Sequence, residues 1–386
     1  MEIKKNVFHV GVNDRQLDLF EGQYAVPNGM AYNSYALVDD KIAVMDTVDE
    51  AFTEEWLNNL ERVLDGRKPD YLVVQHMEPD HSANILSFVN KYPSAKIVAS
   101  AKAFVMMKNF FGVDFSDKQI VVGEGDILPL GKRTLTFFVA PMVHWPEVIV
   151  SYERLDKILF SADAFGKFGV IDAQEDWVCE ARRYYFGVVG KYGVQVQTLL
   201  KKLASIPLEM ICPLHGPILT RNLDNYLGLY DTWSSYEAES EGVMIAYTSV
   251  YGNTEEAVNL LAQQLKAYGC DKVVVIDLAR SDMSEAVEEA FRYKTIVLAT
   301  TTYNGGIFPF MREFLHHLTE RNFQKRRIAF VENGTWAPMA TRIMKGMLEG
   351  CKDLQYAEKQ VKILSSMNEE NKMQIDALAQ ELANAK

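Results

Sequence analysis

The sequence predicts an α/β protein of two domains, and this prediction rests on three observations. Short apolar runs of strand length alternate with helical patterns along the whole chain, which is typical of α/β folds. The length of 386 residues suits two to three domains of ordinary size. The spacing of the apolar runs along the sequence changes after a polar stretch, residues 236–242. We therefore expect one domain over residues 1–241 and another over residues 242–386.

The apolar runs of the first domain predict a mixed or partly antiparallel sheet. Several of these runs lie close together and are joined by short turns, such as Gly131-Lys132-Arg133. Turns this short join antiparallel strands, whereas parallel strands need a long crossover. The expected strands are residues 41–46, 71–75, 96–100, 135–140, 147–152, 157–160 and 210–213.

The apolar runs of the second domain predict a doubly wound parallel sheet. Strand-length runs here are separated by helix-length segments, and a final helix is expected over about residues 369–384. Such regular crossovers are typical of an open parallel sheet with helices on both faces. The expected strands are residues 243–247, 272–277, 295–300, 327–331 and 361–364.

Composition and charge exclude several classes of partner and compartment. The net charge of −12 argues against nucleic acid and anionic membranes, because both need basic patches. No stretch reaches the roughly 18–20 consecutive apolar residues of a membrane span, and the N-terminus lacks the apolar core of a secretory signal. The four cysteines form no CxxC pair. We therefore expect a soluble protein in a reducing cytoplasm.

The densest group of candidate metal ligands directly follows the strand expected at residues 71–75. Two imidazoles and two carboxylates occur within six residues, in the run His76-Met77-Glu78-Pro79-Asp80-His81. Imidazole suits iron, zinc and copper, while carboxylates bind hard cations and can bridge a metal pair. So many ionisable side chains at one strand end would cost stability unless they are paired or metallated. The run therefore predicts a dinuclear site with mixed nitrogen and oxygen ligands.

Three downstream residues follow other strand ends in the same way. Taken singly, His144 and His215 would be interpreted as hydrogen-bonded structural histidines, and Asp163 as a helix cap or turn residue. Each has Gly or Pro nearby to turn the backbone, and together they complete a ligand set with the first run. The predicted metal ligands are His76, Glu78, Asp80, His81, His144, Asp163 and His215.

The second domain opens with a pattern that predicts a phosphate site. Its first strand runs into a Ser- and Thr-rich loop, residues 248–254, and then into a helix. Hydroxyl groups and free backbone N–H groups at a helix N-terminus bind anions without Lys or Arg, and Gly252 allows close approach of the backbone. A Walker lysine and a GxGxxG motif are both missing. A monophosphate such as that of FMN fits this loop.

Two further loops, at residues 300–306 and 332–336, follow the third and fourth strands and flank the switch point where doubly wound sheets bind ligands. Tyr303 and Trp336 either pack on the flavin ring or serve as ordinary packing anchors. The predicted FMN-binding residues are Thr248, Ser249, Val250, Tyr251, Gly252, Asn253, Thr254, Thr300, Thr301, Thr302, Tyr303, Asn304, Gly305, Glu332, Asn333, Gly334, Thr335 and Trp336.

The order of the metal residues resembles that of the metallo-β-lactamase-like superfold. The usual hydrolase version has a second histidine where this chain has Glu78, and a carboxylate there shifts the preference from zinc toward iron. The set His-x-Glu-x-Asp-His, followed by His, Asp and His, resembles that of flavodiiron proteins, and the three flavin loops are similar to those of their flavodoxin domain. The resemblance covers the whole chain and is closest to the simplest, A-type class.

This resemblance implies a metallo-β-lactamase-like αββα domain followed by a flavodoxin-like domain. It implies that His76, Glu78 and His144 hold one iron, that Asp80, His81 and His215 hold the other, and that Asp163 bridges ions about 3.5–4 Å apart. The implied activity is reduction of dioxygen to water, of nitric oxide to nitrous oxide, or of both, with electrons relayed through FMN. Rubredoxin is the expected donor.

Two single positions and an assembly also follow from the resemblance. Tyr192 is expected next to the metal ligands, and Glu21 stands where many relatives have a histidine.

Domains of the expected lengths have radii of gyration of about 18 and 15 Å, so their centres lie on the order of 30 Å apart within one chain. Electron tunnelling over such a gap is slow. A head-to-tail homodimer, or a dimer of such dimers, would place one chain's FMN beside the other chain's irons.

Two other functions remain open at this point. The first is a zinc hydrolase fused to a flavodoxin module, which metal identity would distinguish from a reductase. Glu78 and the intact flavin loops count against it. The second is an electron carrier whose first domain is vestigial, although a vestigial site would be expected to have lost ligands.

Overall fold

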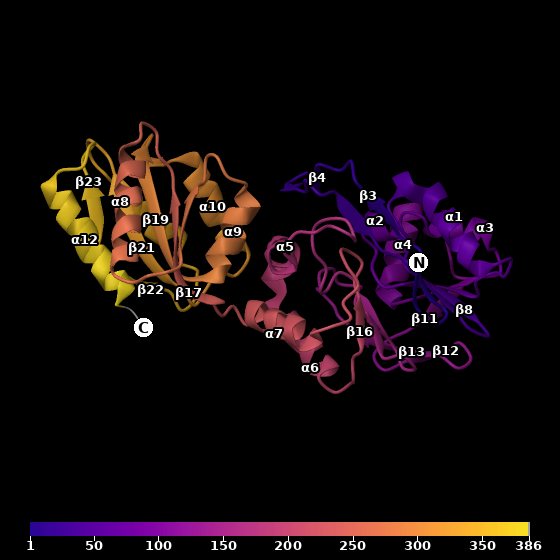
Figure 1. Cartoon of the computed structure of the whole chain (residues 1–386). Coiled ribbons are helices and arrows are strands. Elements are labelled where there is room, and N and C mark those ends of the chain that lie inside the picture. The colour runs from indigo at the N-terminus through magenta and orange to yellow at the C-terminus, as the bar shows by residue number, and fades with distance from the viewer. Residues whose placement is uncertain (385–386) are drawn as a thin grey trace. The chain divides into compact units, whose positions relative to one another are not determined.

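The structure is a computed structural model that describes residues 1–384 and forms two compact units, Met1–Asp231 and a second unit beginning at Thr232 (Figure 1). The predicted α/β class is confirmed. The predicted boundary at residue 241 lies later in the chain than this division, and it falls inside β17 (Ser240–Tyr247). Ala385 and Lys386, at the end of the predicted second domain, lie outside the described residues.

The polar stretch at residues 236–242 belongs to the second unit. Arg326 is buried, and its Nη1 donates to the carbonyl oxygen of Tyr236 at 2.7 Å. Lys325 Nζ lies 2.6 Å from Glu237 Oε1. These contacts attach the polar stretch to the second unit.

The first sheet of the first unit is mixed, as the sequence predicted. Its strand order is β1-β2-β7-β8-β9-β10-β11, antiparallel as far as β8 and parallel from β8 onward. The strands are β1 (Glu2–Lys4), β2 (Val7–His9), β7 (Tyr35–Val38), β8 (Ile42–Met45), β9 (Tyr71–Val74), β10 (Lys96–Ala99) and β11 (Gln119–Val121).

The second sheet of this unit has the order β12-β13-β14-β15-β16, antiparallel except for the last pair. Its strands are β12 (Ile127–Pro129), β13 (Thr134–Val139), β14 (Ile149–Glu153), β15 (Ile158–Phe160) and β16 (Met210–Cys212). Two short pairs lie outside both sheets, β3 (Val12–Asp14) with β6 (Met30–Tyr32), and β4 (Leu19–Phe20) with β5 (Tyr24–Ala25).

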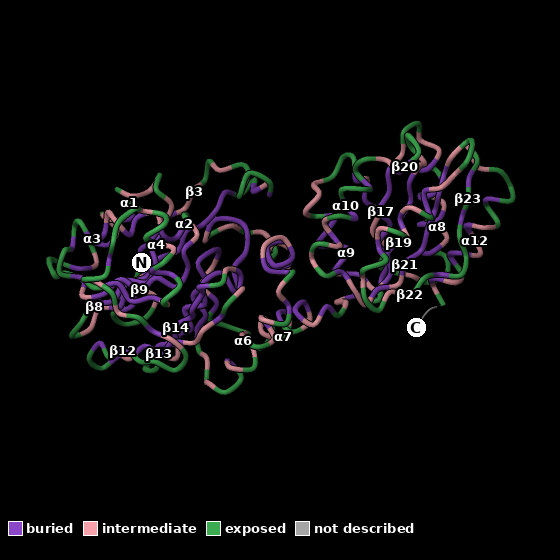
Figure 2. Tube along the Cα trace, turned by 180° about the vertical axis from the view of Figure 1, so that it is seen from behind, coloured by how far each residue is buried: buried purple, intermediate pink, exposed green. Residues whose placement is uncertain are grey.

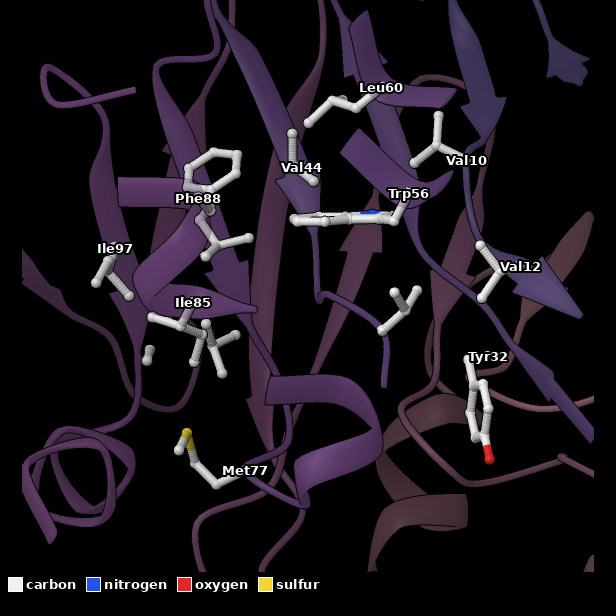
Figure 3. Packing of buried hydrophobic residues seen from close by; sticks show 14 of the residues in the cluster. Val10, Val12, Tyr32, Val44, Trp56, Leu60, Met77, Ile85, Phe88 and Ile97 are labelled. Atoms are coloured by element: carbon white, nitrogen blue, oxygen red, sulfur yellow. The ribbon is translucent and has the colours of Figure 1, made fainter. Parts of the chain in front are cut away.

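Burial of apolar side chains on both faces of the first sheet holds the unit together. One face packs against the second sheet, since a single apolar cluster includes Val73 from the first sheet and Phe137 and Phe160 from the second. The other face is covered by α1 (Thr53–Leu64), α3 (Ile85–Lys91) and α4 (Ala101–Phe111). Figure 3 shows Trp56 of α1 beside Val44 in this layer. Such burial contributes about 25 cal/mol per Å² of apolar surface.

The first unit also contains α2 (Pro79–Ser82), α5 (Trp177–Tyr184) and α6 (Gly193–Leu203), and α7 (Leu223–Ser234) runs across the division after Asp231. In both units the strands are largely buried and the exposed residues concentrate in loops and on the outer sides of helices (Figure 2). None of the helices in residues 1–384 combines the length and the apolar character that crossing a bilayer requires.

The second unit is the predicted doubly wound parallel sheet. Its strands run in the order β18-β17-β19-β21, and β23 pairs in parallel with β21. Helices α8 and α12 share one apolar cluster on one face, and α9 and α10 lie on the other (Figure 1). The elements are β17, α8 (Asn253–Ala267), β18 (Val273–Asp277), α9 (Met283–Arg292), β19 (Tyr293–Tyr303), β20 (Gly306–Ile307), α10 (Pro309–Glu320), β21 (Arg327–Asn333), α11 (Ala340–Met347), β22 (Gln355–Tyr356), β23 (Val361–Ile363) and α12 (Glu369–Ala383).

Candidate functional site

The loop after β9 and the short helix α2 that follows it carry four of the predicted metal residues. Pro79 starts α2, where its fixed φ suits the first helical turn and its missing N–H costs no hydrogen bond. The buried carboxylate of Asp46 holds the beginning of the loop, because its Oδ1 accepts from the backbone N–H groups of Gln75 at 2.7 Å and His76 at 3.3 Å. The loop is therefore tied to the end of β8.

A first cluster of possible ligands consists of His76, Glu78, His144 and Asp163. The Nε2 atoms of His76 and His144 lie 3.3 Å apart. Oε2 of Glu78 lies 3.3 Å from Nε2 of His76 and 3.1 Å from Nε2 of His144. Two imidazole nitrogens that share a tetrahedral ion at 2.0–2.1 Å are separated by about 3.3 Å. The spacing of the first cluster therefore matches a shared metal ion.

A second cluster consists of Asp80, His81 and His215. The Nε2 atoms of the two histidines lie 3.0 Å apart. Oδ2 of Asp80 lies 3.2 Å from Nε2 of His81 and 3.3 Å from Nε2 of His215. All three residues are buried. This cluster repeats the donor chemistry of the first, with two imidazoles and one carboxylate of its own.

Asp163 lies between the two clusters. Its Oδ2 is 2.9 Å from Nε2 of His144 and 3.3 Å from Nε2 of His76. Its Oδ1 is 3.4 Å from Nε2 of His81 and 3.7 Å from Nε2 of His215. Each oxygen of one carboxylate thus faces a different pair of imidazoles, which is the arrangement of a bridging ligand in a dinuclear site.

The charges within the clusters hold the carboxylates in the form that binds metal. Burial by itself opposes ionisation of Asp163, but the neighbouring histidines His76, His144 and His81 hold its pKa well below the usual range. Burial likewise lowers the pKa of His144, yet hydrogen bonds to Asp163 and Glu78 raise it to about 9. Since metal ligands must be deprotonated, the ionised carboxylates are ready to bind a cation.

Several enclosed polar atoms lack a hydrogen-bond partner in the described part of the protein and are suited to bind a metal ion. Both carboxylate oxygens of Asp80 and Oδ1 of Asp163 are shielded from solvent and have no hydrogen-bond partner among residues 1–384. Enclosed carboxylate oxygens without partners carry a large desolvation cost. A pair of cations between the clusters would satisfy these oxygens together with the four Nε2 lone pairs, so the residues present fit two metal ions.

The second unit has a cleft of about 330 Å³ at the carboxyl ends of its strands. Its lining combines the three predicted loops with one further residue, Ser365. Twelve of the predicted FMN residues line it, namely Ser249, Val250, Tyr251, Asn253, Thr254, Thr301, Thr302, Tyr303, Asn333, Gly334, Thr335 and Trp336.

The other six predicted FMN residues support or adjoin this cleft. Thr248 and Thr300 are buried, with their hydroxyl groups 2.6 Å apart, and Glu332 Oε2 accepts from the backbone N–H of Thr341 at 3.0 Å. Gly252 precedes α8 with a φ of +91°. Asn304 and Gly305 form a turn with positive φ, and Asn304 lines a neighbouring cavity.

The cleft fits a phosphorylated aromatic ligand. Ser249 Oγ accepts from the backbone N–H groups of Gly252 and Glu255, at the N-terminus of α8. Such N–H groups attract an anion. Thr301 Oγ1 is shielded from solvent without a partner among residues 1–384. At the rim, Tyr251 is 92% exposed and Trp336 is 81% exposed, which leaves two large rings free to contact a flat ligand.

Comparison with known proteins assigns both units. Residues 30–216 match the ODP family beta lactamase, and residues 244–375 match a flavodoxin domain. A nitric oxide reductase of Moorella thermoacetica is 30% identical over 362 residues, which cover 91% of this chain and 90% of that protein. An anaerobic nitric oxide reductase flavorubredoxin of Vibrio vulnificus is 27% identical and covers 87% of this chain and 70% of its own length.

Solved structures agree with this assignment over nearly the whole chain. The flavodiiron protein of Giardia intestinalis superposes with a TM-score of 0.92 at 25% identity, covering 99% of this chain and 95% of its own. The chain belongs to the flavodiiron protein family. The rubredoxin oxygen:oxidoreductase of Desulfovibrio gigas gives a TM-score of 0.91 at 27% identity, covering 99% of this chain and 97% of its own. The flavodiiron chain is thus an oxidoreductase with a metallo-β-lactamase-like and a flavodoxin-like domain.

A buried tyrosine beside the second cluster of this flavodiiron protein is Tyr184, which the sequence had not singled out. Its ring lies 5.5 Å from that of His215, and the side chain is fully buried at the end of α5. Burial, with smaller contributions from the carboxylates of Asp163 and Glu78, raises the pKa of Tyr184 well above the usual value. Tyr192, the predicted tyrosine, ends a 3₁₀ turn and is half-buried. No contact recorded within residues 1–384 joins it to a metal residue, so its role stays a prediction.

Glu21 does lie near the metal site, as the sequence suggested. It sits at the turn between β4 and β5 with a φ of +50°, and Gln23 Nε2 donates to its Oε2 at 3.1 Å. Desolvation and the nearby charge of Glu78 raise the pKa of Glu21. The carboxylate of Glu21 therefore adds negative charge near Glu78 of the first cluster.

Proposed function

We propose that this flavodiiron protein holds two iron ions between its metal clusters and FMN in its cleft, and that it reduces nitric oxide to nitrous oxide, dioxygen to water, or both. The observation that carries the proposal is the position of Asp163, whose two oxygens face two separate imidazole pairs. Relatives similar over most of their length are named nitric oxide reductase and rubredoxin oxygen:oxidoreductase, which supports these substrates.

The donor set of the first cluster favours iron over zinc. Each cluster has two imidazoles and one carboxylate of its own, Glu78 in the first and Asp80 in the second, and both share Asp163. Added carboxylates supply harder ligands and more negative charge than a set of neutral imidazoles. This composition supports a redox site rather than the alternative zinc hydrolase.

Aromatic residues around the clusters restrict access of water. The rings of Phe20 and Tyr32 lie 5.4 and 6.0 Å from that of His215, and the ring of Trp145 lies 5.2 Å from that of His76. The ring of Tyr184 lies 5.5 Å from that of His215 and adds to this aromatic lining. When bound, a di-iron pair with FMN supplies electrons one at a time to a small diatomic molecule.

The cleft supports binding of FMN through its phosphate. The N-terminus of α8 offers backbone N–H groups beside Ser249 and Thr254, and a helix N-terminus carries a partial positive charge. Asn333 and Thr335 are held by Ser365, since Asn333 Nδ2 donates to its carbonyl oxygen at 2.8 Å and the hydroxyls of Thr335 and Ser365 lie 2.6 Å apart. These contacts keep the opposite wall of the cleft in place.

Metal and flavin content of protein purified without oxygen tests the proposal first. We expect two irons and one FMN per chain, because the clusters provide two equivalent donor sets and the second unit one flavin cleft. Rapid mixing of the reduced protein with nitric oxide and with dioxygen then measures both rates. Zinc in place of iron, with FMN bound and hydrolytic turnover of a thioester, would assign the first unit to hydrolysis and end the reductase proposal.

We further propose that the protein works as a head-to-tail homodimer, alone or as a dimer of dimers, and takes electrons from a rubredoxin-like donor in the cytoplasm. The proposal addresses the gap on the order of 30 Å expected between two domain centres of these sizes. Dilution below the dimer dissociation constant should lower turnover per chain, while rapid reduction of FMN by the donor persists. Full turnover by a monomer, verified by sedimentation at the assay concentration, would refute the dimer.

A further inference from the structure

The two metal clusters have matched ligands but differ in what lies behind their histidines. Nδ1 of His76, in the first cluster, lies 2.9 Å from Oε1 of Glu147. In the second cluster, Nδ1 of His215 donates to the backbone carbonyl of Ala31 at 2.8 Å, and Nδ1 of His81 is enclosed without a partner among residues 1–384. One cluster is therefore backed by a carboxylate, and the other by a neutral carbonyl.

Glu147 is placed for this contact and for no other ionic role that the structure shows. Its side chain is 2% exposed, and its Oε1 also accepts from the backbone N–H of Met77 at 2.8 Å. The second oxygen, Oε2, is enclosed without a hydrogen bond, and none of the ion pairs recorded within residues 1–384 joins Glu147 to a lysine or arginine. A buried carboxylate is costly without compensation, so its contact with His76 is the evident reason for its presence.

The loop that carries Glu147 also supplies a ligand. His144 and Glu147 lie in the turn between β13 and β14, where the backbone N–H of Met142 donates to the carbonyl of Trp145 at 2.8 Å. Ser100 Oγ donates to the carbonyl oxygen of Glu147 at 2.8 Å. One anchored turn thus positions His144 directly and His76 through Glu147.

We infer that Glu147 is a positioning residue that makes the first cluster the tighter of the two metal positions, an inference that rests on the proposed two-metal site. Donation from Nδ1–H to a carboxylate fixes the tautomer of His76, directs the Nε2 lone pair at the metal and raises the basicity of the ligand. A backbone carbonyl also fixes the tautomer of His215, but it adds no charge. Each cluster has two imidazoles and one carboxylate of its own, so the partner behind the histidine is the contact that separates the two clusters by a full charge.

Stepwise titration of the metal-free protein with Fe²⁺ under anaerobic conditions, followed by calorimetry, tests this inference without an activity assay. The wild-type protein should bind two ions in two resolved steps. Glu147→Gln keeps the shape and an acceptor but removes the charge, so it should weaken the tighter step by about 10- to 100-fold, the usual cost of losing such a partner. The weaker step should change less than about threefold. Asp80→Asn, which alters only the second cluster, should weaken the other step and so assign the two.

The matched control is Glu209→Gln, which removes the same charge from an exposed residue of the first unit whose carboxylate pairs with Lys157 at 3.3 Å. It should change both steps less than about threefold, because solvent screens it. Equal losses from Glu209→Gln and Glu147→Gln, equal weakening of both steps by Glu147→Gln, or a single unresolved step in the wild type would each overturn the inference. If Glu147→Gln does not fold, Glu147→Asp, which shortens the reach, should give the same selective loss. Binding of fewer than two ions by the wild type would instead defeat the proposed function itself.

Discussion

Asp163→Ala is expected to remove at least one iron per chain and to abolish turnover with both nitric oxide and dioxygen. The side chain places one oxygen within 3.3 Å of the two imidazoles of the first cluster and the other within 3.7 Å of those of the second. Its loss takes a ligand from both ions and removes the negative charge between them. Because losing a group behind a ligand already costs about 10- to 100-fold, loss of this shared ligand should lower turnover about 100-fold or more.

Two other variants separate the bridging role from general loss of charge. Asp163→Asn keeps one side-chain carbonyl oxygen. This variant should therefore retain one tightly bound iron and show little turnover. Asp156→Ala removes a carboxylate of the same unit that pairs with Arg133 at 2.7 Å outside the metal site, and it should retain both irons. Iron counts from elemental analysis, together with anaerobic rapid mixing, measure these outcomes. Two irons and wild-type turnover in Asp163→Ala would exclude the bridge.

The convergence of the seven metal residues could be predicted from the sequence because the signal was local. Four of them occur in the run from His76 to His81, and the others lie in the loops that follow β13, β15 and β16. Strand ends of a layered α/β fold meet at one edge, so residues distant in sequence come together there. The doubly wound order of the second unit was predictable for a similar reason, since regular crossovers leave few topologies.

Contacts that depend on tertiary geometry could not be predicted. Glu147 lies 71 residues from His76, and nothing in its sequence neighbourhood distinguishes it from an ordinary strand residue. Tyr184 was missed in favour of Tyr192, because only the course of α5 determines which tyrosine faces His215. Ser365, which completes the flavin cleft, follows a strand of three residues. Strands such as β1, β2 and β11 are also only three residues long, too short for an alternating pattern to be evident.

Ser249→Asp is expected to produce a protein with its iron in place and almost no bound FMN. Ser249 lines the cleft, and its Oγ accepts from backbone N–H groups at the N-terminus of α8. An aspartate there would occupy the N–H groups that attract the phosphate and would also repel it. Two unit charges about 4 Å apart near a protein surface interact by about 4 kcal/mol, so the affinity for FMN should fall about 100-fold or more.

Riboflavin distinguishes this repulsion from damage to the cleft, because riboflavin has the same ring system without the phosphate. Fluorescence titration of the flavin-free protein should show that Ser249→Asp weakens FMN binding while riboflavin binding changes less than about threefold. The matched control is Ser281→Asp, which adds the same charge to an exposed residue just before Asp282, the N-cap of α9, and should bind FMN normally. Equal losses of FMN and riboflavin in Ser249→Asp would mean that the loop is deformed. Unchanged FMN affinity would place the phosphate elsewhere, and the assignment of the 248–254 loop as the phosphate site would then be wrong.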